Sequence, residues 1–316
     1  MTRIRIALVG VGKIARDQHV PALVGDNRFE LVATVSLQGS VKGVPAFADI
    51  HEMITKVEGL HAVSICTPAA ARFELAQTAI DAGLHVMVEK PPAATVSEIV
   101  ALRRRAGDKG VALFATWHSR EAAGVEPARQ WLAGKDIRSV RITWKEDIRR
   151  WHPGQEWILD RGGFGVFDHG INALSIATRI LPHELLLQAA GMEVPEGRSA
   201  PLRATLEMRT GTAPVKAEFD FLKSGRQTWD ISVETGEGLL VLSKGGRVLE
   251  LPGGLTLEGP DREYPRLYTH FATLAASARS DVDTAPLQLV ADAFLVADRR
   301  SGDPFAFEQP CAAANG

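Results

Sequence analysis

A glycine motif placed directly after an apolar run constrains the fold of this chain more than any other feature. The run Ile4 to Val9 leads without interruption into Gly10-Val11-Gly12-Lys13-Ile14-Ala15, a Gly-x-Gly-x-x-Ala sequence. In such a motif the first glycine allows a tight turn, the second lets backbone approach a pyrophosphate, and the alanine lets a helix pack closely on the strand. The motif predicts a strand, a turn and a helix whose N-terminus holds the phosphates of a dinucleotide.

Strand and helix signals alternate over the first 120 residues. Helical patterns such as Ile14 to Leu23 and Phe73 to Ala82 lie between short apolar runs, and Gly83 ends the second of these patterns. Short buried strands that alternate with helices favour an α/β fold with a parallel sheet and helices on both faces. We expect a dinucleotide-binding Rossmann domain over residues 1–120. Its predicted strands are Ile4 to Val9, Phe29 to Val35, Ala62 to Cys66, His85 to Val88 and Ala112 to Thr116.

The pattern changes after about Trp117, where strand signals become longer. Within Val215 to Phe221, apolar residues alternate with charged ones, as a half-buried strand requires. We expect residues 121–316 to form an α+β domain with a large open, mostly antiparallel sheet, which binds substrate and carries oligomer contacts. The other predicted strands are Ser139 to Lys145, Arg203 to Arg209, Thr228 to Glu234 and Gly238 to Ser243, and the predicted helices are Pro127 to Leu132, Gly170 to Leu181, Leu267 to Ala278 and Pro286 to Arg299.

Composition narrows the class of protein. The chain has 316 residues, of which 45% are hydrophobic and 23% charged, which excludes disorder as the main state. Its 36 basic and 38 acidic residues argue against a generally basic nucleic-acid binder. Two cysteines, Cys66 and Cys311, without a CxxC cluster indicate a reducing compartment. With no signal peptide and no membrane-length apolar run, we expect a cytoplasmic protein without a membrane partner.

Two further expectations concern metals and assembly. The histidines show no HxH or HExxH spacing, so no metal site is predicted. An open sheet needs cover on one face, which favours a homodimer or a higher homo-oligomer. Size-exclusion elution at the mass of one 34.1 kDa chain would contradict the second expectation.

The residues after the second predicted strand leave the choice of dinucleotide open. NAD-selective sites usually place an acid near this point to bind the ribose hydroxyls. Here the strand runs into Ser36-Leu37-Gln38, which contains no carboxylate. Ser36 could bind a 2′-phosphate, but no arginine follows it, and Lys13 and Lys42 are the nearest cations. Either NAD or NADP is therefore expected, and a plain strand-end hydroxyl is the alternative reading of Ser36.

A lysine follows the fourth predicted strand. Glu89-Lys90-Pro91 stands at the carboxyl end of that strand, where ligands bind in open parallel sheets. Pro91 restricts Lys90 to an extended backbone. The pair could also be a solvated loop pair, but its position in the fold favours a functional lysine.

Four segments together resemble the Gfo/Idh/MocA oxidoreductase family over essentially the whole chain. They are the glycine motif, Cys66-Thr67-Pro68, Glu89-Lys90-Pro91 and the stretch from Gly162 to Asn172. In this last stretch, glycines are followed by Asp168 and, four residues later, by Asn172. The resemblance implies a Rossmann domain that binds NAD or NADP, with a second domain for the substrate. The residues it implies at the cofactor are Gly10, Gly12, Lys13, Ile14, Ser36, Cys66, Thr67, Pro68 and Glu89.

More narrowly, the chain resembles the bacterial aldose 1-dehydrogenases that act on L-arabinose and D-galactose. This resemblance implies oxidation of the pyranose at C1 to the aldonolactone, with hydride transfer to NAD(P)+. The strings that carry it are Lys13 to His19, Ala115 to Arg120, Trp144 to Asp147, Arg150 to Gln155, Gly165 to Asp168 and Gly170 to Ile176.

The resemblance also implies the catalytic residues, with one departure. Many members of the family have histidine four residues after the aspartate, where this chain has Asn172. An amide does not titrate, so Asn172 can hydrogen-bond the reacting hydroxyl but cannot be the base. We expect Lys90 to accept the proton and Asp168 to orient Lys90, and the swapped roles stay open. The spacing of four places Asp168 and Asn172 on one face of a helix.

A sugar site needs polar groups for the hydroxyls and an aromatic platform for the ring. His19 and His169 are left out of the catalytic set, and Trp144 and Trp157 are as readily explained by packing. Two other functions stay open: another sugar or polyol oxidoreductase of the family, and a non-catalytic NAD(P)-binding sugar sensor, which would have no need of Lys90. The candidate lining residues are Trp117, His118, Glu146, Trp151, His152 and Trp229.

Overall fold

The chain forms two compact units that do not follow one another simply in sequence. The computed structural model describes residues 3–37 and 39–307, so that Gln38 and Cys311 lie outside the described residues. The first unit comprises Met1–Glu121 and Arg262–Leu287, and the second comprises Ala122–Asp261 and Gln288–Gly316. The chain therefore leaves the first unit and returns to it about 140 residues later.

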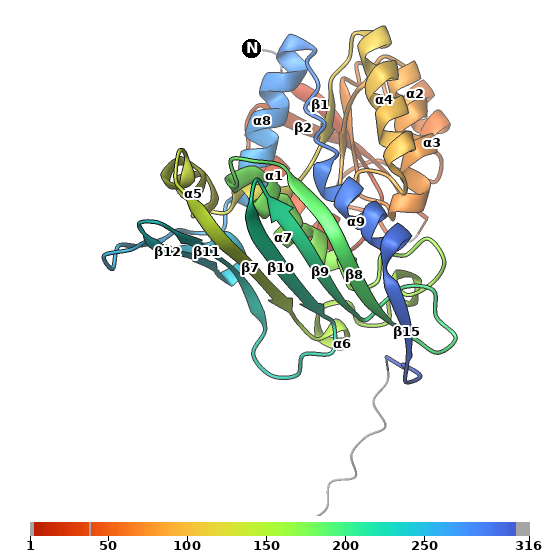
Figure 1. The fold of residues 1–316 in the computed structure, drawn as a ribbon. Helices are drawn as coiled ribbons and strands as arrows, with labels where there is room; N and C mark the ends of the chain where they lie inside the picture. The colour runs from red at the N-terminus through yellow and green to blue at the C-terminus, as the bar shows by residue number, and fades with distance from the viewer. Residues whose placement is uncertain (1–2, 38, 308–316) are drawn as a thin grey trace, which may run out of the picture. The chain divides into compact units, whose positions relative to one another are not determined.

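A six-stranded parallel sheet forms the centre of the first unit (Figure 1). The strand order is β3-β2-β1-β4-β5-β6, and every neighbouring pair is parallel. This confirms the predicted Rossmann sheet. The two-residue strand β3, which pairs with the end of β2, is too short to give a sequence signal. The strands are β1 (Ile4–Val9), β2 (Phe29–Val35), β3 (Ala46–Phe47), β4 (Ala62–Ile65), β5 (His85–Val88) and β6 (Leu113–Ala115).

Local capping residues begin and end the helices of this unit. The Asp49 carboxylate accepts the backbone N–H of Glu52 at the start of α2, and Thr95 forms a reciprocal capping box with Glu98 at the start of α4. Gly110, with φ of 65°, ends α4. Figure 1 shows α2, α3 and α4 grouped beside the sheet. The helices are α1 (Val20–Val24), α2 (Ile50–Lys56), α3 (Ala69–Asp81) and α4 (Val96–Lys109), with a 3-10 turn η2 (His118–Glu121).

The helix predicted over Ile14 to Leu23 is divided in two. A π-helical turn, η1 (Ala15–His19), precedes α1. Pro21 lacks a backbone N–H, so a regular α-helical hydrogen-bond ladder cannot run through this point. The wider turn places His19 in the interior, where it is fully buried.

The helix α8 (Glu263–Ser277) returns the chain to the first unit. Its inward side chains join the core that β1, β2 and the first helices begin. Tyr268 packs edge-on against Phe29, with ring centroids 5.3 Å apart. Beyond the helix, the backbone N–H of Asp281 donates to the carbonyl oxygen of Leu113 in β6 at 3.0 Å. The first unit is thus completed by a late segment of the sequence.

A nine-stranded sheet forms the second unit, in the order β14-β13-β12-β11-β7-β10-β9-β8-β15. Two neighbouring pairs, β7 with β10 and β8 with β15, are parallel and the others are antiparallel, which confirms a mostly antiparallel sheet. The strands are β7 (Ile137–Lys145), β8 (Leu185–Pro195), β9 (Arg203–Thr210), β10 (Ala213–Asp220), β11 (Thr228–Thr235), β12 (Gly238–Ser243), β13 (Val248–Glu250), β14 (Thr256–Glu258) and β15 (Asp298–Gly302).

The edges of this sheet differ from the prediction. The helix expected over Pro286 to Arg299 ends earlier, as α9 (Ala285–Val296). The following residues form β15, because they pair in parallel with Gly191–Pro195 of β8. The sequence did not predict β8, whose ladder is interrupted by a register shift between Leu187 and Ala189.

One helix, α7 (Phe167–Ile180), packs on the middle of the nine-stranded sheet through β7 and β11. Gly170 allows this close approach, because a Cβ there would lie 2.8 Å from Phe219 Cδ1. Alternate residues of β9 are buried and exposed, so this strand has one inward and one outward face. The other helical segments of the unit are α5 (Val125–Leu132), α6 (Ile148–Trp151), η3 (Glu156–Ile158) and η4 (Lys244–Gly246).

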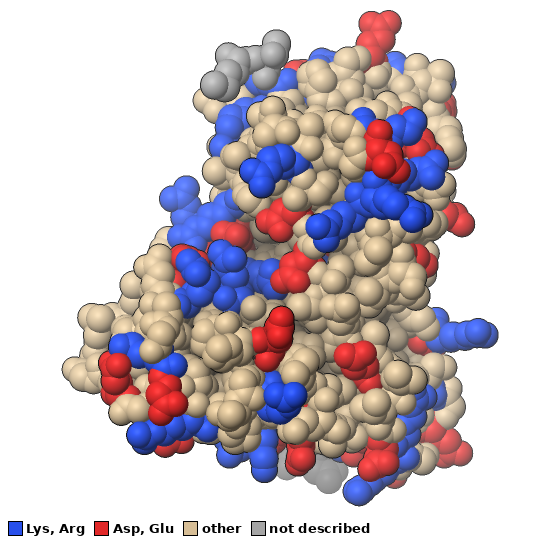
Figure 2. Space-filling view, turned by 45° about the horizontal axis from the view of Figure 1, so that its top comes forward, with Lys and Arg blue, Asp and Glu red and all other residues tan. Residues whose placement is uncertain are grey.

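Two surface properties bear on the classes of partner. No helix within the described ranges is long and apolar enough to cross a membrane. On the face drawn in Figure 2, acidic side chains are interspersed among basic ones. This mixture agrees with the net charge of −2 over the whole sequence.

Candidate functional site

The glycine turn of the first unit is tight at one glycine and open at the other. Gly10 has φ of 91° and donates its N–H to the carbonyl oxygen of Val35 at 2.7 Å. A Cβ on Gly10 would lie 2.9 Å from both Cγ2 and the backbone N of Thr67. A Cβ on Gly12 would meet no atom of residues 3–37 and 39–307 within 4 Å. The turn therefore requires glycine at the first position and leaves open space at the second, as a phosphate-binding turn must.

Other predicted cofactor residues lie around this turn. The hydroxyl oxygen of Thr67 is buried and has no hydrogen-bond partner among the residues that the structure describes, which is unusual for a buried polar atom unless a ligand supplies the partner. Lys13 forms an ion pair with Asp17 on the surface. Ser36 closes β2 and donates its N–H to the carbonyl oxygen of Phe47. The orphaned hydroxyl and the open space at the turn fit a bound dinucleotide.

The three remaining cofactor candidates differ in exposure. The thiol of Cys66 is buried and lies 3.9 Å from the carbonyl oxygen of Ser64. Pro68 is exposed at the N-cap of α3, and Ile14 is exposed directly before η1. Of these side chains, only Ile14 and Pro68 are accessible to a ligand on the surface.

Replacing Gly10 by alanine is expected to lower the free energy of unfolding by about 1–3 kcal/mol, because the backbone is left-handed and Cβ would contact Thr67. The matched variant Gly12→Ala is expected to keep stability and lose dinucleotide affinity, since its methyl group fills only the open space. Thermal unfolding and fluorescence titration with the reduced dinucleotide measure the two effects. Greater destabilisation by the second variant would contradict this account of the turn.

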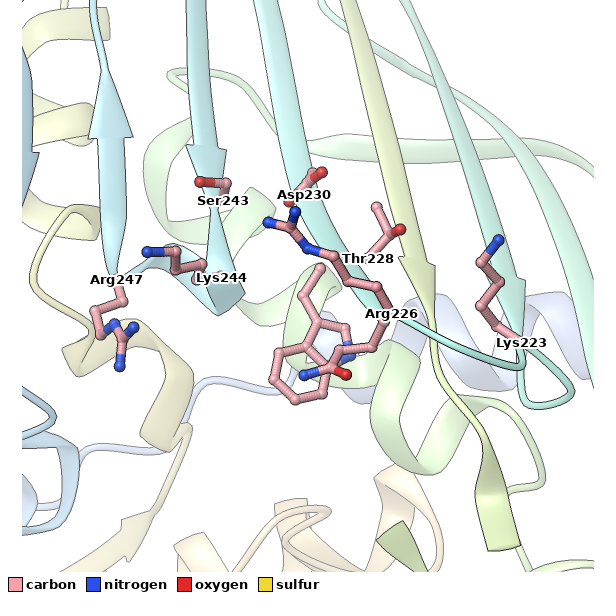
Figure 3. A pocket seen from close by; sticks show the side chains of 9 residues that line it. Lys223, Arg226, Thr228, Asp230, Ser243, Lys244 and Arg247 are labelled. Atoms are coloured by element: carbon pink, nitrogen blue, oxygen red, sulfur yellow. The ribbon is translucent and has the colours of Figure 1, made fainter. Parts of the chain in front are cut away.

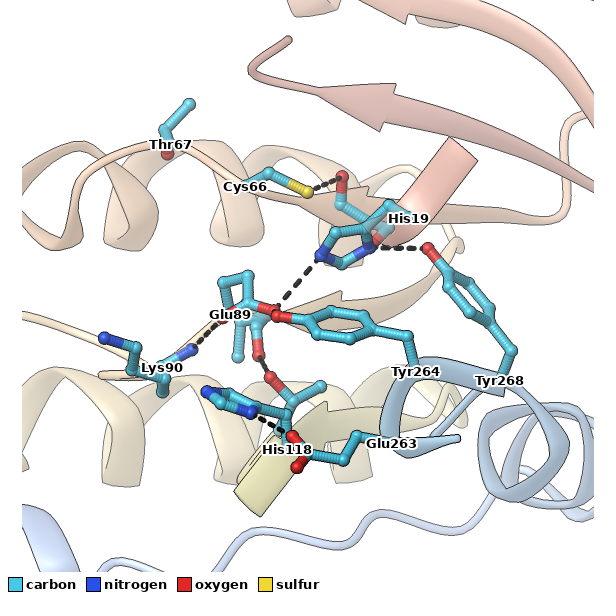
Figure 4. Close-up of polar contacts among 12 residues, drawn as sticks. His19, Cys66, Thr67, Glu89, Lys90, His118, Glu263, Tyr264 and Tyr268 are labelled. Atoms are coloured by element: carbon cyan, nitrogen blue, oxygen red, sulfur yellow. Dashed lines mark hydrogen bonds and ion pairs between the residues drawn. The ribbon is translucent and has the colours of Figure 1, made fainter. Parts of the chain in front are cut away.

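The backbone around Lys90 is held from several directions at the end of β5. The Glu89 carboxylate is 3% exposed, and its Oε2 accepts the backbone N–H of Lys90 at 2.9 Å. The guanidinium of Arg72, also buried, donates to the carbonyl oxygens of Thr67, Glu89 and Pro91. Figure 4 shows Lys90 beside Glu89, with its side chain directed away from the tyrosines of α8. These hydrogen bonds therefore fix the backbone of Lys90, whose side chain is half-buried.

The structure places the other candidates of this unit, Trp117 and His118, in different surroundings. His118 Nδ1 lies 2.6 Å from Glu263 Oε2, and its ring stacks on Tyr264. Burial lowers the pKa of His118, but the hydrogen bond and charge of Glu263 outweigh burial and raise it. Trp117 is buried and donates its Nε1–H to the carbonyl oxygen of Asp283.

Four predicted side chains of the second unit converge from four different elements. Glu146 follows β7, His152 follows α6, Asp168 lies in the first turn of α7, and Trp229 belongs to β11. Trp229 Nε1 donates to Glu146 Oε2 at 2.9 Å. His152 Nε2 lies 3.6 Å from Glu146 Oε1 and 3.7 Å from Asp168 Oδ2. These last separations are too long for direct hydrogen bonds, so the group presents polar atoms that a bound hydroxyl can bridge.

Aromatic rings lie beside these polar groups. The ring of Trp229 lies 5.3 Å from that of Trp151 and 6.3 Å from that of Trp144, measured between centroids. Trp144 is buried, whereas Trp151 is 36% exposed. Asn172 is half-buried one helical turn after Asp168. The second unit therefore offers an aromatic surface next to two nearly buried carboxylates.

His169, which was not among the residues predicted from the sequence, belongs to the same group. Its Nε2 lies 3.1 Å from the carbonyl oxygen of Trp144, so Nε2 carries the proton of the neutral ring. Burial lowers the pKa of His169 despite the opposing charge of Glu146. The other nitrogen, Nδ1, is buried, has no hydrogen-bond partner in the described part of the chain and lies 3.6 Å from Glu146 Oε1. Adjacency to Asp168 was the only sequence signal for this residue.

A basic cavity of about 760 Å³ also involves Trp229 (Figure 3). Arginine and lysine side chains approach it from the ends of β11 and β12 and from neighbouring turns. Burial raises the pKa of Asp230, the single acid in its lining. The lining residues are Lys223, Arg226, Gln227, Thr228, Trp229, Asp230, Ser243, Lys244 and Arg247. In residues 3–37 and 39–307, no group of three or more acidic, histidine or cysteine side chains could hold a metal ion.

Comparison with known proteins agrees with this arrangement. A sequence model of the GFO_IDH_MocA family, described as an oxidoreductase family with an NAD-binding Rossmann fold, matches residues 4–116. The galactose 1-dehydrogenase of Pseudomonas fluorescens is 40% identical over 96% of this chain and 99% of its own length. The crystal structure of a D-galactose 1-dehydrogenase from Rhizobium etli covers 97% of this chain and 99% of its own, with 48% identity and a TM-score of 0.93.

A more distant structure shares the fold alone. A 3-ketoreductase from Actinomadura kijaniata, in complex with NADP and TDP-benzene, is 17% identical over 95% of this chain and all of its own, with a TM-score of 0.83. The family model covers the glycine turn and the lysine loop, the residues Glu89 to Pro91 after β5, and the galactose 1-dehydrogenases extend the likeness to the second unit. The chain therefore belongs to the Gfo/Idh/MocA family of oxidoreductases, and its first unit is an NAD(P)-binding Rossmann domain.

Proposed function

We propose that this chain is a galactose 1-dehydrogenase that oxidises C1 of D-galactopyranose to the lactone with NAD or NADP. The observation that carries the proposal is the likeness to two galactose 1-dehydrogenases, at 40% and 48% identity, over nearly the whole length of each chain. L-Arabinose is the second candidate substrate, because its pyranose has the same ring configuration from C2 to C4 and lacks only the hydroxymethyl group on C5.

The polar and aromatic groups of the second unit support a sugar substrate. The carboxylates of Glu146 and Asp168, 4% and 6% exposed, can accept hydrogen bonds from sugar hydroxyls. His152 can hydrogen-bond such a hydroxyl, and Trp151 and Trp229 can contact the apolar face of the ring. In this proposal these residues bind and orient the aldose.

The residues also account for the proton of the reacting hydroxyl. The dinucleotide, when bound to the glycine turn and Thr67, supplies the acceptor for the hydride of C1. Lys90 takes the proton of the C1 hydroxyl, Asp168 orients the reacting groups, and Asn172 hydrogen-bonds the same hydroxyl. The O–H bond breaks, the electrons of the C1–H bond leave as hydride, and the C1–O bond becomes the carbonyl of the lactone. The ring of the lactone is the one already present in the pyranose. Proton transfer to Asp168 is the alternative assignment.

The test is absorbance at the reduced-nicotinamide band with D-galactose and L-arabinose, each assayed with NAD and with NADP. Turnover with either sugar supports the proposal, and the four rates give the preference for dinucleotide and for the C5 substituent. No turnover in any of the four reactions, with dinucleotide binding confirmed by fluorescence, would contradict it. The chain would then be a dehydrogenase of another sugar or polyol, or a sugar sensor.

Replacing Trp229 by phenylalanine is expected to raise KM for D-galactose about tenfold with a smaller effect on kcat. The change removes the Nε1–H donor that orients Glu146 but keeps an aromatic ring. Trp157→Phe is the matched control, since this tryptophan is 40% exposed and belongs to η3. Equal KM values for the two variants would remove Trp229 from the proposed sugar site.

Self-association belongs to the same proposal. The outward residues of β9 are exposed, and a second copy of the chain would cover this face of the sheet. We expect a homodimer or a larger homo-oligomer in solution. Light scattering at the mass of one chain would contradict it.

A further inference from the structure

A fully buried histidine contacts the glutamate that precedes the proposed catalytic lysine. His19 lies in η1, directly after the glycine turn, and its Nε2 lies 3.1 Å from Glu89 Oε1. The same carboxylate uses its other oxygen to accept the backbone N–H of Lys90. One carboxylate thus connects the imidazole to the lysine loop (Figure 4). The proposed reaction does not use His19.

Tyrosines from α8 complete the surroundings of this pair. Tyr264 Oη donates to Glu89 Oε1 at 2.7 Å. On the far side of the imidazole, Nδ1 of His19 lies 2.7 Å from Tyr268 Oη and 3.3 Å from Ser64 Oγ. Each of these side chains is at most 3% exposed. Solvent therefore cannot screen the charges of His19 and Glu89, and the hydrogen bonds fix the rings of His19, Tyr264 and Tyr268.

The electrostatics favour a charged pair. Burial by itself would raise the pKa of the Glu89 carboxyl. The hydrogen bond and charge of His19 outweigh burial, with smaller contributions from His118 and Arg72, and hold that pKa well below its usual range. Since the carboxylate stays ionised, its negative charge favours the protonated form of the neighbouring lysine unless an opposite charge compensates the carboxylate.

The protonation of His19 depends on its own neighbours. Burial lowers the pKa of the imidazole, but Cys66, Tyr268 and Glu89 together raise it well above the ordinary value. Both ring nitrogens have an oxygen within 3.1 Å, as a doubly protonated imidazole requires. An imidazolium beside Glu89 makes the pair neutral as a whole.

We propose that His19 is a positioning residue for Lys90, which acts through the buried Glu89 carboxylate. Its ring holds Glu89, Glu89 holds the backbone of Lys90, and the positive charge of the ring compensates the carboxylate. The Lys90 amine then loses its proton more readily than it would beside an uncompensated Glu89. The inference rests on the proposed function only for the part that Lys90 plays in turnover.

Charged and titratable groups reach this cluster from every element packed against it. Among them, His19 and Arg72 are positive and Glu89 is negative, while His118 is paired with the Glu263 carboxylate. The groups are His19 of η1, Cys66 after β4, Arg72 of α3, His118 of η2, and Glu263, Tyr264 and Tyr268 of α8.

The test compares the amine of Lys90 in the full-length protein and its variants by acetylation with acetic anhydride. Mass spectrometry follows the extent of labelling between pH 5 and pH 11, with the exposed Lys109 as internal reference. In His19→Gln the labelling curve of Lys90 is expected to move up by about one pH unit, because the charge is lost while an amide donor remains. The acid limb of kcat/KM is expected to move by the same amount, with the dinucleotide affinity unchanged.

Two tyrosine variants make the test independent of the folding of His19→Gln. Tyr268→Phe removes one oxygen from the far side of the imidazole and is expected to move the curve in the same direction by less. Tyr264→Phe removes a neutral donor from Glu89, keeps every charge, and is expected to leave the curve in place. An unmoved curve in His19→Gln and Tyr268→Phe, or an equal shift in all three variants, would overturn the proposal.

Labelling also separates this inference from the proposed function. If the wild-type chain oxidises no aldose, the proposed function fails. The labelling curves still decide whether His19 controls the Lys90 amine. If turnover is present and the curves do not move, His19 has no positioning role and the proposed function stands.

Discussion

Replacing Lys90 by alanine is expected to lower kcat about 10²–10⁴-fold, the usual range for loss of a general acid or base. The reaction would lose its proton acceptor, while the glycine turn and Thr67, which support dinucleotide binding, would be untouched. Initial rates at the reduced-nicotinamide band measure the loss, and fluorescence titration measures the dinucleotide affinity, which is expected to stay unchanged.

Lys109→Ala is the matched control for this variant, because Lys109 is exposed in the last turn of α4 in the same unit. It is expected to behave as wild type in both measurements. Normal turnover by Lys90→Ala would remove the lysine from the proposed chemistry. It would make the alternative assignment, with Asp168 as proton acceptor, the one to test next.

Asp168→Asn is expected to lower kcat about 10²–10³-fold, because the amide keeps the shape of the carboxyl group but loses the charge that orients the reacting groups. In the alternative assignment, the same change removes the proton acceptor itself. The carboxylate is 6% exposed and lies 3.7 Å from His152 Nε2, so its loss also removes a negative charge beside the imidazole. The pH profiles of this variant and of Lys90→Ala distinguish the two assignments. The fall of kcat toward acid pH is expected to disappear only in the variant that replaces the true proton acceptor.

Asp160→Asn provides the control for a lost carboxylate elsewhere in the same unit, since Asp160 is exposed and pairs with Arg198. We expect it to keep wild-type kcat. If Asp168→Asn also keeps wild-type kcat, Asp168 would be a helix-end charge rather than part of the reaction.

The Rossmann sheet could be predicted because its signals are local. Each of the five predicted strands is a short apolar run, and Gly10 and Gly83 mark the ends of elements, whereas the two-residue β3 gives no such signal. The two ends of the nine-stranded sheet could not be predicted, because pairing across the sheet decides them. Asp298–Gly302 reads as the end of a helix, and only the parallel partner β8 makes it a strand.

In the candidate site, too, residues with local sequence signals could be predicted and residues defined by distant contacts could not. Residues in motifs, such as Lys90 and Asp168, could be identified from spacing and resemblance. His19 could not, because its hydrogen-bond partners Glu89 and Tyr268 lie 70 and 249 positions away in the sequence. Nothing in the neighbouring sequence distinguishes a histidine that meets a buried carboxylate from one that is exposed.

The return of α8 to the first unit has a consequence for synthesis of the chain. When the ribosome has made the first 121 residues, every strand of the parallel sheet exists, but the tyrosines that line one side of its core do not. At ordinary elongation rates the missing helix follows on the order of ten seconds later. During that interval Glu89 and His19 lack their tyrosine partners, and the nascent Rossmann unit exposes an apolar surface to which a chaperone can bind.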